Sequence, residues 1–376
     1  MNYSSGGFNI PPDNNYTAQN SSNLKIPHFI EPALWFREKI NLKRLSSLSA
    51  FAVLGYILIS AIVVGIMQGA FAILQNIPSF DYNAFSEKWN SAEFQYAFDA
   101  LYSVFVVGLP FFGVGIFAHK KGYLTTIPTG KPKNPKMLPI VVFGAFGMCL
   151  SGNFVVSYID AIVNMLTGFE IEMPDMPVPQ KSFIGILIYF ISISVVPALV
   201  EEFALRGVIM QMLRRYGDNF ALLTSALIFG LMHCNLQQIP FAFIAGYAIG
   251  YAVIITDSLW TGVIIHFLNN AFSAAMALIT DTYGFDSPET KATTVVFYAL
   301  ILIGLLCTIM VFRNPDRCKL KKSPLVNQGK DFYGRVPMFS AKITTGKLFR
   351  EYLFTAPMII AYIAVAYQTI ALIMAM

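Results

Sequence analysis

Long uncharged apolar runs recur along the whole chain, and they constrain its fold more than any other feature. A membrane-spanning helix needs about 20 consecutive, mostly apolar residues. A single helix also satisfies its own backbone hydrogen bonds, as the bilayer demands. Nine such segments can be placed, at 47–75, 98–118, 138–160, 182–212, 219–235, 239–256, 259–280, 292–312 and 353–375. We therefore predict an all-α, polytopic transmembrane bundle of about eight to nine helices, with its active site inside the membrane.

The composition excludes several other classes of protein. Charged residues make up only 12% of the 376 residues, whereas a soluble domain carries about 25%. The net charge is +5, and the basic residues lie between apolar runs. We predict an integral membrane protein that has no nucleic-acid partner.

The loops alternate in charge, which predicts the orientation of the chain. Basic residues gather before residue 45, at 120–136, at 214–215 and in the long loop 313–351, whereas acidic residues gather at 81–93, 170–175 and 281–289. By the positive-inside rule the N-terminus is cytoplasmic, and an odd number of crossings places the C-terminus outside. We predict that loop 313–351 rests on an anionic membrane surface; a substrate-docking role is the alternative. The short loops are typical of a bacterial plasma-membrane protein.

Three polar clusters interrupt the apolar segments. They are Glu201-Glu202 with Arg206, then Phe229 with His233, then His266 with Asn270. A charge in hydrocarbon costs at least about 2.5–3.5 kcal/mol, so such residues are functional candidates by default.

The spacing within the first cluster divides its residues between two roles. Glu202 and Arg206 are four residues apart, on one helix face, and can form an ion pair that lowers the cost of both charges. Glu201 is rotated by about 100° from Glu202. We predict that Glu202 and Arg206 brace the helix while Glu201 faces a reacting water. Pro197 removes a backbone hydrogen bond and predicts a kink nearby.

The three clusters are predicted to meet. At 1.5 Å per residue, Glu201, His233 and His266 lie about 20, 21 and 14 Å from the cytoplasmic ends of their helices. Antiparallel neighbours would therefore bring these side chains to a similar depth. Asn270, four residues after His266, can orient that ring or donate to an oxyanion. For His233 the alternative is a structural histidine packed on Phe229.

These motifs, in this order, resemble the CPBP family of intramembrane proteases, also called Abi or type II CAAX prenyl endopeptidase-like. The family pattern is EExxxR, FxxxH and HxxxN, each on its own transmembrane helix. Here the pattern is matched by Glu201, Glu202 and Arg206, then Phe229 and His233, then His266 and Asn270. The similarity extends over about residues 182–280, including Gly207, Leu213-Arg214-Arg215-Tyr216 and Ser258-Leu259-Trp260.

The resemblance implies hydrolysis of a peptide bond inside the membrane. Glu201 would act as general base and activate water with His233, while His266 and Asn270 would stabilise the oxyanion. Glu202, Arg206 and Phe229 would support the site. The substrate would be a membrane-associated or prenylated CAAX-type peptide, or a bacteriocin-like peptide.

The need for a metal is left open by the sequence. Glu201, His233 and His266 could ligate zinc, and a metal-free water activated by Glu and His is equally compatible; we favour the metal-free form. HExxH is absent, as are GxSG-like and GxGD-like signatures of other intramembrane proteases.

The chain divides into four predicted regions. They are a cytoplasmic, largely disordered basic tail (1–45), peripheral transmembrane helices (46–181), a CPBP-like catalytic core (182–280) and C-terminal transmembrane helices with the basic loop (281–376). Two other functions remain as alternatives. One is a non-proteolytic immunity or binding protein of the same fold, and the other is a proton-coupled transporter, in which buried Glu and His relay protons.

Overall fold

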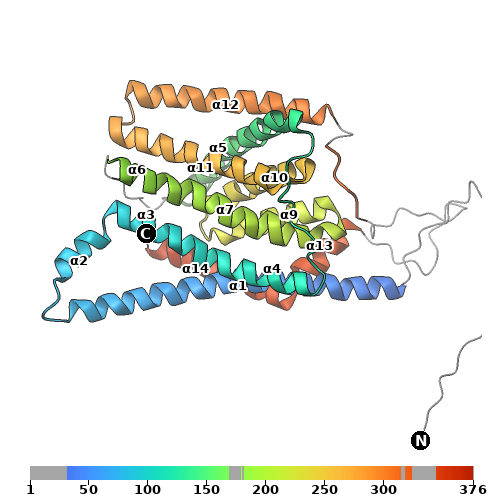
Figure 1. Ribbon diagram of the computed structural model, residues 1–376, viewed down its shortest axis with the longest axis horizontal. Helices are drawn as coiled ribbons and strands as arrows, with labels where there is room; N and C mark the ends of the chain where they lie inside the picture. The colour runs from blue at the N-terminus through green and yellow to red at the C-terminus, as the bar shows by residue number, and fades with distance from the viewer. Residues whose placement is uncertain (1–31, 169–178, 180–181, 315–317, 324–343, 376) are drawn as a thin grey trace, which may run out of the picture.

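The computed structural model describes residues 32–168, 179, 182–314, 318–323 and 344–375, and its regular elements are helices (Figure 1). The α-helices are α1 Pro32–Gln75, α2 Tyr82–Trp89, α3 Ala92–Tyr102, α4 Leu109–Lys120, α5 Leu138–Thr167, α6 Phe183–Phe190, α7 Val196–Glu202, α8 Met210–Leu213, α9 Asp218–Met232, α10 Gln238–Thr256, α11 Leu259–Tyr283, α12 Pro288–Phe312, α13 Thr345–Leu353 and α14 Ala356–Ala375. Three π-helical segments, Ser103–Gly108, Ile191–Val195 and Phe203–Ile209, join α3 to α4, α6 to α7 and α7 to α8. The all-α prediction is therefore confirmed.

Eight continuous helices in the described part of the chain are long and apolar enough to cross a membrane. The ninth predicted segment, 219–235, corresponds to α9, which has 15 residues. At 1.5 Å per residue it reaches only about 22 Å, less than the hydrocarbon thickness of about 30 Å. The protein is an integral membrane protein, and α9 ends inside the bundle.

The first helix begins earlier than the sequence indicated. α1 starts at Pro32, so part of the range predicted as a disordered tail is helical. Its first turns pack against the protein: Leu42 and Leu45 are fully buried, and Glu38 forms an ion pair with Arg215 at 3.2 Å. These contacts extend the helix beyond the apolar run that predicted it. The tail up to residue 31 lies outside the described residues.

Part of the predicted basic loop is also helical, which its charged sequence did not indicate. α13 packs on α1 through Tyr352, whose hydroxyl donates to Ser49 Oγ at 2.6 Å, and an ion pair of 2.9 Å joins Lys39 to Glu351. Leu348 is fully buried beside them. The basic residues of 324–343 and the acidic stretch 170–175 lie outside the described residues, so membrane contact by this loop stays a prediction.

The beginning of α1 and the end of α14 lie at opposite ends of the bundle (Figure 1). α1 begins at the right of Figure 1, and α14 runs back toward the left, alongside α1. Which end is cytoplasmic stays a prediction.

The interior of the bundle depends on close helix crossings. α5 packs against α10 and α12. At the crossing with α12, a Cβ added to Gly147 would lie 2.6 Å from Gly304 Cα. Small residues of this kind let transmembrane backbones approach closely. α7, α9 and α11 meet inside this frame and carry the three polar clusters.

Candidate active site within the membrane

The helix that carries both glutamates departs from regular α-helical geometry on either side of them. Val196–Glu202 is α-helical, and π-helical segments precede and follow it. Pro197 is the second residue of α7, two residues after the end of the first π-helical segment, so the interruption predicted there takes the form of a π-helical turn. Such turns occur frequently at functional sites.

Glu202 is the centre of a buried polar network. Its Oε1 accepts a hydrogen bond of 2.8 Å from Arg206 Nη1 and another of 2.9 Å from His266 Nδ1. Arg206 Nη2 donates to the carbonyl of Gly246 at 3.1 Å. Side-chain exposure is 0% for Glu202, 1% for Arg206 and 6% for His266. The predicted ion pair is present, and it is also bonded to the second histidine motif.

This bond to His266 corrects the role we assigned from the sequence. Glu202 was expected to brace Arg206 alone, whereas in the structure it also fixes the His266 ring. Because an ionised carboxylate can only accept, Nδ1 carries the hydrogen, and Nε2 is free to act as an acceptor in the neutral ring. Of the two roles predicted for Asn270, orienting this ring therefore belongs to Glu202.

Glu201 approaches the same histidine from its other nitrogen. Glu201 Oε2 lies 3.9 Å from His266 Nε2, and the Glu201 side chain is 19% exposed. This distance is too long for a direct hydrogen bond, and polar atoms at such a separation can be joined by a water. The two glutamates thus flank His266, one buried in the ion pair and the other open to a reacting molecule.

Phe229 connects the arginine with both histidines. The Arg206 guanidinium lies 4.5 Å from the centre of the Phe229 ring, and the rings of His233 and His266 lie 5.0 and 5.9 Å from it. A cation over an aromatic face gains about 0.5–2 kcal/mol. Phe229 is 4% exposed, so it also seals the ion pair from the bilayer.

His233 follows the last residue of α9. Its Nδ1 lies 2.9 Å from the carbonyl oxygen of Phe229, which can only accept, so Nδ1 donates and Nε2 is left as the acceptor. The clusters on α7, α9 and α11 therefore meet, as their calculated depths predicted. Cooperation of His233 with Glu201 stays a prediction.

Asn270 is part of a short amide chain. Its Nδ2 donates to the carbonyl of Ile193, in the π-helical turn before α7, at 3.0 Å, and its Oδ1 accepts from Asn269 at 3.1 Å. One N–H of Asn270 remains for an oxyanion. Sequence reasoning missed Asn269, which is 5% exposed and lies directly before Asn270; a second amide inside the apolar run was the available signal.

The candidate metal ligands do not form a ligand set. In the described part of the chain no three His, Cys, Asp or Glu side chains are grouped so that they could hold a metal ion. His266 Nδ1 and His233 Nδ1 are both engaged by protein oxygens. The Nε2 atoms of both rings remain free, and whether the reaction needs a metal ion stays a prediction.

Two glycines make room for the buried pair of Glu202 and Arg206, and no feature of the sequence singled them out. A Cβ at Gly262 would lie 2.8 Å from Glu202 Oε2 and 2.7 Å from Val253 Cγ2, and one at Gly246 would lie 2.9 Å from Phe229 Cδ1. Both glycines let a neighbouring helix approach the network.

We expect Gly262→Ala to lower the free energy of unfolding by about 1–3 kcal/mol, the usual cost of overpacking. The added methyl group must displace Glu202, so the position of His266 changes with it. Thermal unfolding in detergent measures the loss. Gly113→Ala is the matched control, since a Cβ there would have nothing within 4 Å. Equal stability of the two variants would contradict the assigned packing.

Comparison with known proteins agrees with this geometry. Residues 183–272 match the family model described as type II CAAX prenyl endopeptidase Rce1-like. No curated protein and no solved structure matches the chain. The matched segment begins at the first residue of α6 and ends two residues after Asn270, so it contains every residue of the site. Residues 183–272, which carry all three polar clusters, are therefore similar to the Rce1-like type II CAAX prenyl endopeptidase family.

Proposed function

We propose that this protein is an intramembrane endopeptidase that hydrolyses a peptide bond of a prenylated, CAAX-type or other membrane-associated peptide. The observation that carries the proposal is that the two glutamates lie at different nitrogens of the His266 ring. Glu202 Oε1 is 2.9 Å from Nδ1, and Glu201 Oε2 is 3.9 Å from Nε2. A buried carboxylate that holds one ring nitrogen while the other faces the reacting groups is the arrangement that orients histidine in hydrolases.

The reaction uses a water held between Glu201 and His266. Glu201 accepts a proton from this water as its oxygen attacks the carbonyl carbon of the peptide bond, and a tetrahedral oxyanion forms. For this step His266 carries a proton on both ring nitrogens before the water attacks and keeps both throughout. Its Nε2–H and the remaining N–H of Asn270 donate to the oxyanion, and the Glu202 carboxylate stabilises the positive charge of the ring. Glu201 then returns the proton to the leaving nitrogen as the C–N bond breaks.

His233 contributes a second acceptor at the same level of the membrane. With its Nδ1 bonded to Phe229, Nε2 can accept a hydrogen bond from the attacking water or from the substrate amide. Metal-free activation is the form we propose; in its support, no three His, Cys, Asp or Glu side chains in the described part of the chain are grouped as a ligand set.

The substrate class follows from the position of the site. Glu201 lies within the apolar segment Phe183–Tyr216, which is long enough to cross a membrane, so the scissile bond must reach the apolar layer. A lipid anchor such as a prenyl group supplies the necessary membrane affinity. We propose the plasma membrane of a bacterium as the location, with the N-terminus cytoplasmic and the C-terminus outside, in keeping with the alternation of charge along the loops.

Comparative peptidomics of membranes tests this function. Membranes with the wild-type protein are expected to accumulate fragments that membranes with Glu201→Gln lack, each ending at a common type of peptide bond. Matching fragments from both membranes would contradict the protease and favour the immunity or binding protein. Proton-driven solute flux by the purified protein in liposomes, unchanged in Glu201→Gln, would instead support a transporter.

A further inference from the structure

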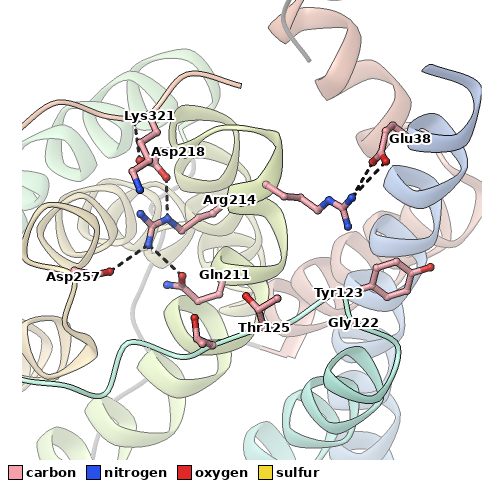
Figure 2. Close-up of a pocket in the computed structure, with 11 residues that line it drawn as sticks. Glu38, Gly122, Tyr123, Thr125, Gln211, Arg214, Asp218, Asp257 and Lys321 are labelled. Carbon is pink, nitrogen blue, oxygen red and sulfur yellow. Dashed lines mark hydrogen bonds and ion pairs between the residues drawn. The ribbon is translucent and has the colours of Figure 1, made fainter. Parts of the chain in front are cut away.

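A charged pocket of about 600 Å³ lies at the end of the bundle where α1 begins, away from the glutamates (Figure 2). It is formed where six segments of the chain come together at that end. Its charged lining residues are Glu38, Arg214, Arg215, Asp218, Asp257 and Lys321. Nothing in the proposed reaction uses this pocket, although its size lies in the usual range for ligand sites.

One wall of the charged pocket is held by Arg214. Its Nε donates to Asp218 Oδ1 at 2.8 Å, and Asp218 Oδ2 accepts from the backbone N–H of Lys321 at 2.8 Å. Arg214 Nη1 also reaches Gln211 and Asp257, at 3.3 and 3.7 Å. Figure 2 shows this group on one side of the pocket and the pair of Glu38 with an arginine, Arg215, on the other.

The charges of this region do not cancel. Each of the three carboxylates is paired: Glu38 with Arg215, Asp218 with Arg214, and Asp257 with Lys133 at 2.7 Å. Arg37 lies 3.9 Å from Glu38, and Lys321 lines the pocket. The charged side chains that line the pocket are balanced, three acidic and three basic. Arg37 and Lys133 do not line it, but each pairs with a lining carboxylate from outside, so the ion-pair network around the pocket carries an excess of two positive charges. The pocket favours an anion.

An apolar groove of about 380 Å³ continues from the charged pocket between α4 and the π-helical segment Phe203–Ile209. Thr125 and Thr126 line both cavities, so the charged pocket and the apolar groove adjoin at these two residues. The groove is lined mainly by Phe112, Ile116, Leu124, Ile127, Phe203 and Val208. Phe112 and Ile116 are about half exposed (52% and 44%), so the groove is open at the perimeter that faces lipid.

We propose that the charged pocket and the apolar groove together bind one anionic glycerophospholipid, with its phosphate in the pocket and an acyl chain in the groove. Anionic lipids gather at basic membrane faces, and basic pockets between transmembrane helices recognise their headgroups. A zwitterionic lipid would gain nothing from two uncompensated positive charges, and a free phosphate would leave the groove unused. The helix that carries Glu201 lines both cavities, so the bound lipid supports that helix.

The affinity of the purified full-length protein for lipid in detergent tests this site, measured by native mass spectrometry without any peptide substrate. Phosphatidylglycerol is expected to bind at least tenfold more tightly than phosphatidylcholine with the same acyl chains. Thr125→Glu/Thr126→Glu should remove most of this preference, because both threonines are exposed and the new charges repel the phosphate. Thr125→Gln/Thr126→Gln, of nearly the same size, should keep it.

A separate substitution tests the apolar groove. Ile116→Trp fills it and should weaken phosphatidylglycerol binding tenfold, whereas Lys291→Gln, which removes a charge near the opposite end of the bundle, should not. Equal binding of the two lipids, or unchanged binding in the Glu pair or in Ile116→Trp, overturns the proposal. Inorganic phosphate competing at the concentration of the lipid would assign a free-anion site instead. Displacement by an equimolar prenylated peptide would assign the groove to substrate, and that result too would overturn it.

Discussion

Arg206→Met is expected to lower the free energy of unfolding by about 3–5 kcal/mol, the largest stability effect that we predict for a single side chain. The substitution keeps an apolar stem of similar length but leaves Glu202 without its ion pair. Glu202 has no exposed surface, so water cannot replace the lost partner. Thermal or chemical unfolding of the purified protein in detergent measures this loss.

The double variant Glu202→Gln/Arg206→Met separates the cost of an unpaired charge from the cost of lost packing. It removes both charges together, and we expect it to recover most of the stability lost in Arg206→Met, since replacing both partners of a buried pair is often nearly neutral. The protein should nevertheless stay inactive, because His266 has lost the carboxylate that holds it. If the double variant is as unstable as Arg206→Met, the ion pair is not the source of the effect.

Glu201→Gln is expected to lower the rate of peptide cleavage by about 10²–10⁴, the usual contribution of a general base. The amide keeps the shape of the side chain but cannot take a proton from water. The change is measured as the rate at which the purified protein cleaves a peptide that the comparative peptidomics has identified as a substrate. Glu289→Gln makes the same chemical change at an exposed position on α12, and this control should cleave at the wild-type rate.

Two results would contradict this role for Glu201. One is cleavage at the wild-type rate by Glu201→Gln. The other is a loss of folded protein in that variant, since its side chain is partly exposed and lies outside the buried ion pair.

Hydropathy and motif spacing predicted most of the bundle and the meeting of its polar groups. Apolar runs of spanning length identify helices because, within a bilayer, a single segment can satisfy all its backbone hydrogen bonds only as a helix. The i,i+4 spacing of Glu202 and Arg206 identified the ion pair, because such residues share a helix face. Helix rise brought Glu201 and His266 to one level, and their side chains are 3.9 Å apart.

Contacts between segments that are far apart in the chain could not be predicted from the sequence. The helical start of α1 and the whole of α13 are stabilised by pairs such as Lys39 with Glu351, more than 300 residues apart. The bond from Glu202 to His266 depends on how α7 packs against α11, which the sequence does not show. Pro197 predicted an interruption before the glutamates but not its π-helical form. Gly262 matters for the same reason, through a contact with another helix.

Glu201 and Glu202, although adjacent, have separate roles, and a paired measurement on one variant of each tests this separation. Unfolding temperature and cleavage rate are to be determined on the same preparations of Glu201→Gln and Glu202→Gln. We predict that Glu201→Gln keeps the wild-type unfolding temperature and loses cleavage, whereas Glu202→Gln loses both, because it leaves Arg206 buried without a carboxylate. Equal destabilisation by the two substitutions, or cleavage retained in Glu201→Gln, would contradict the account.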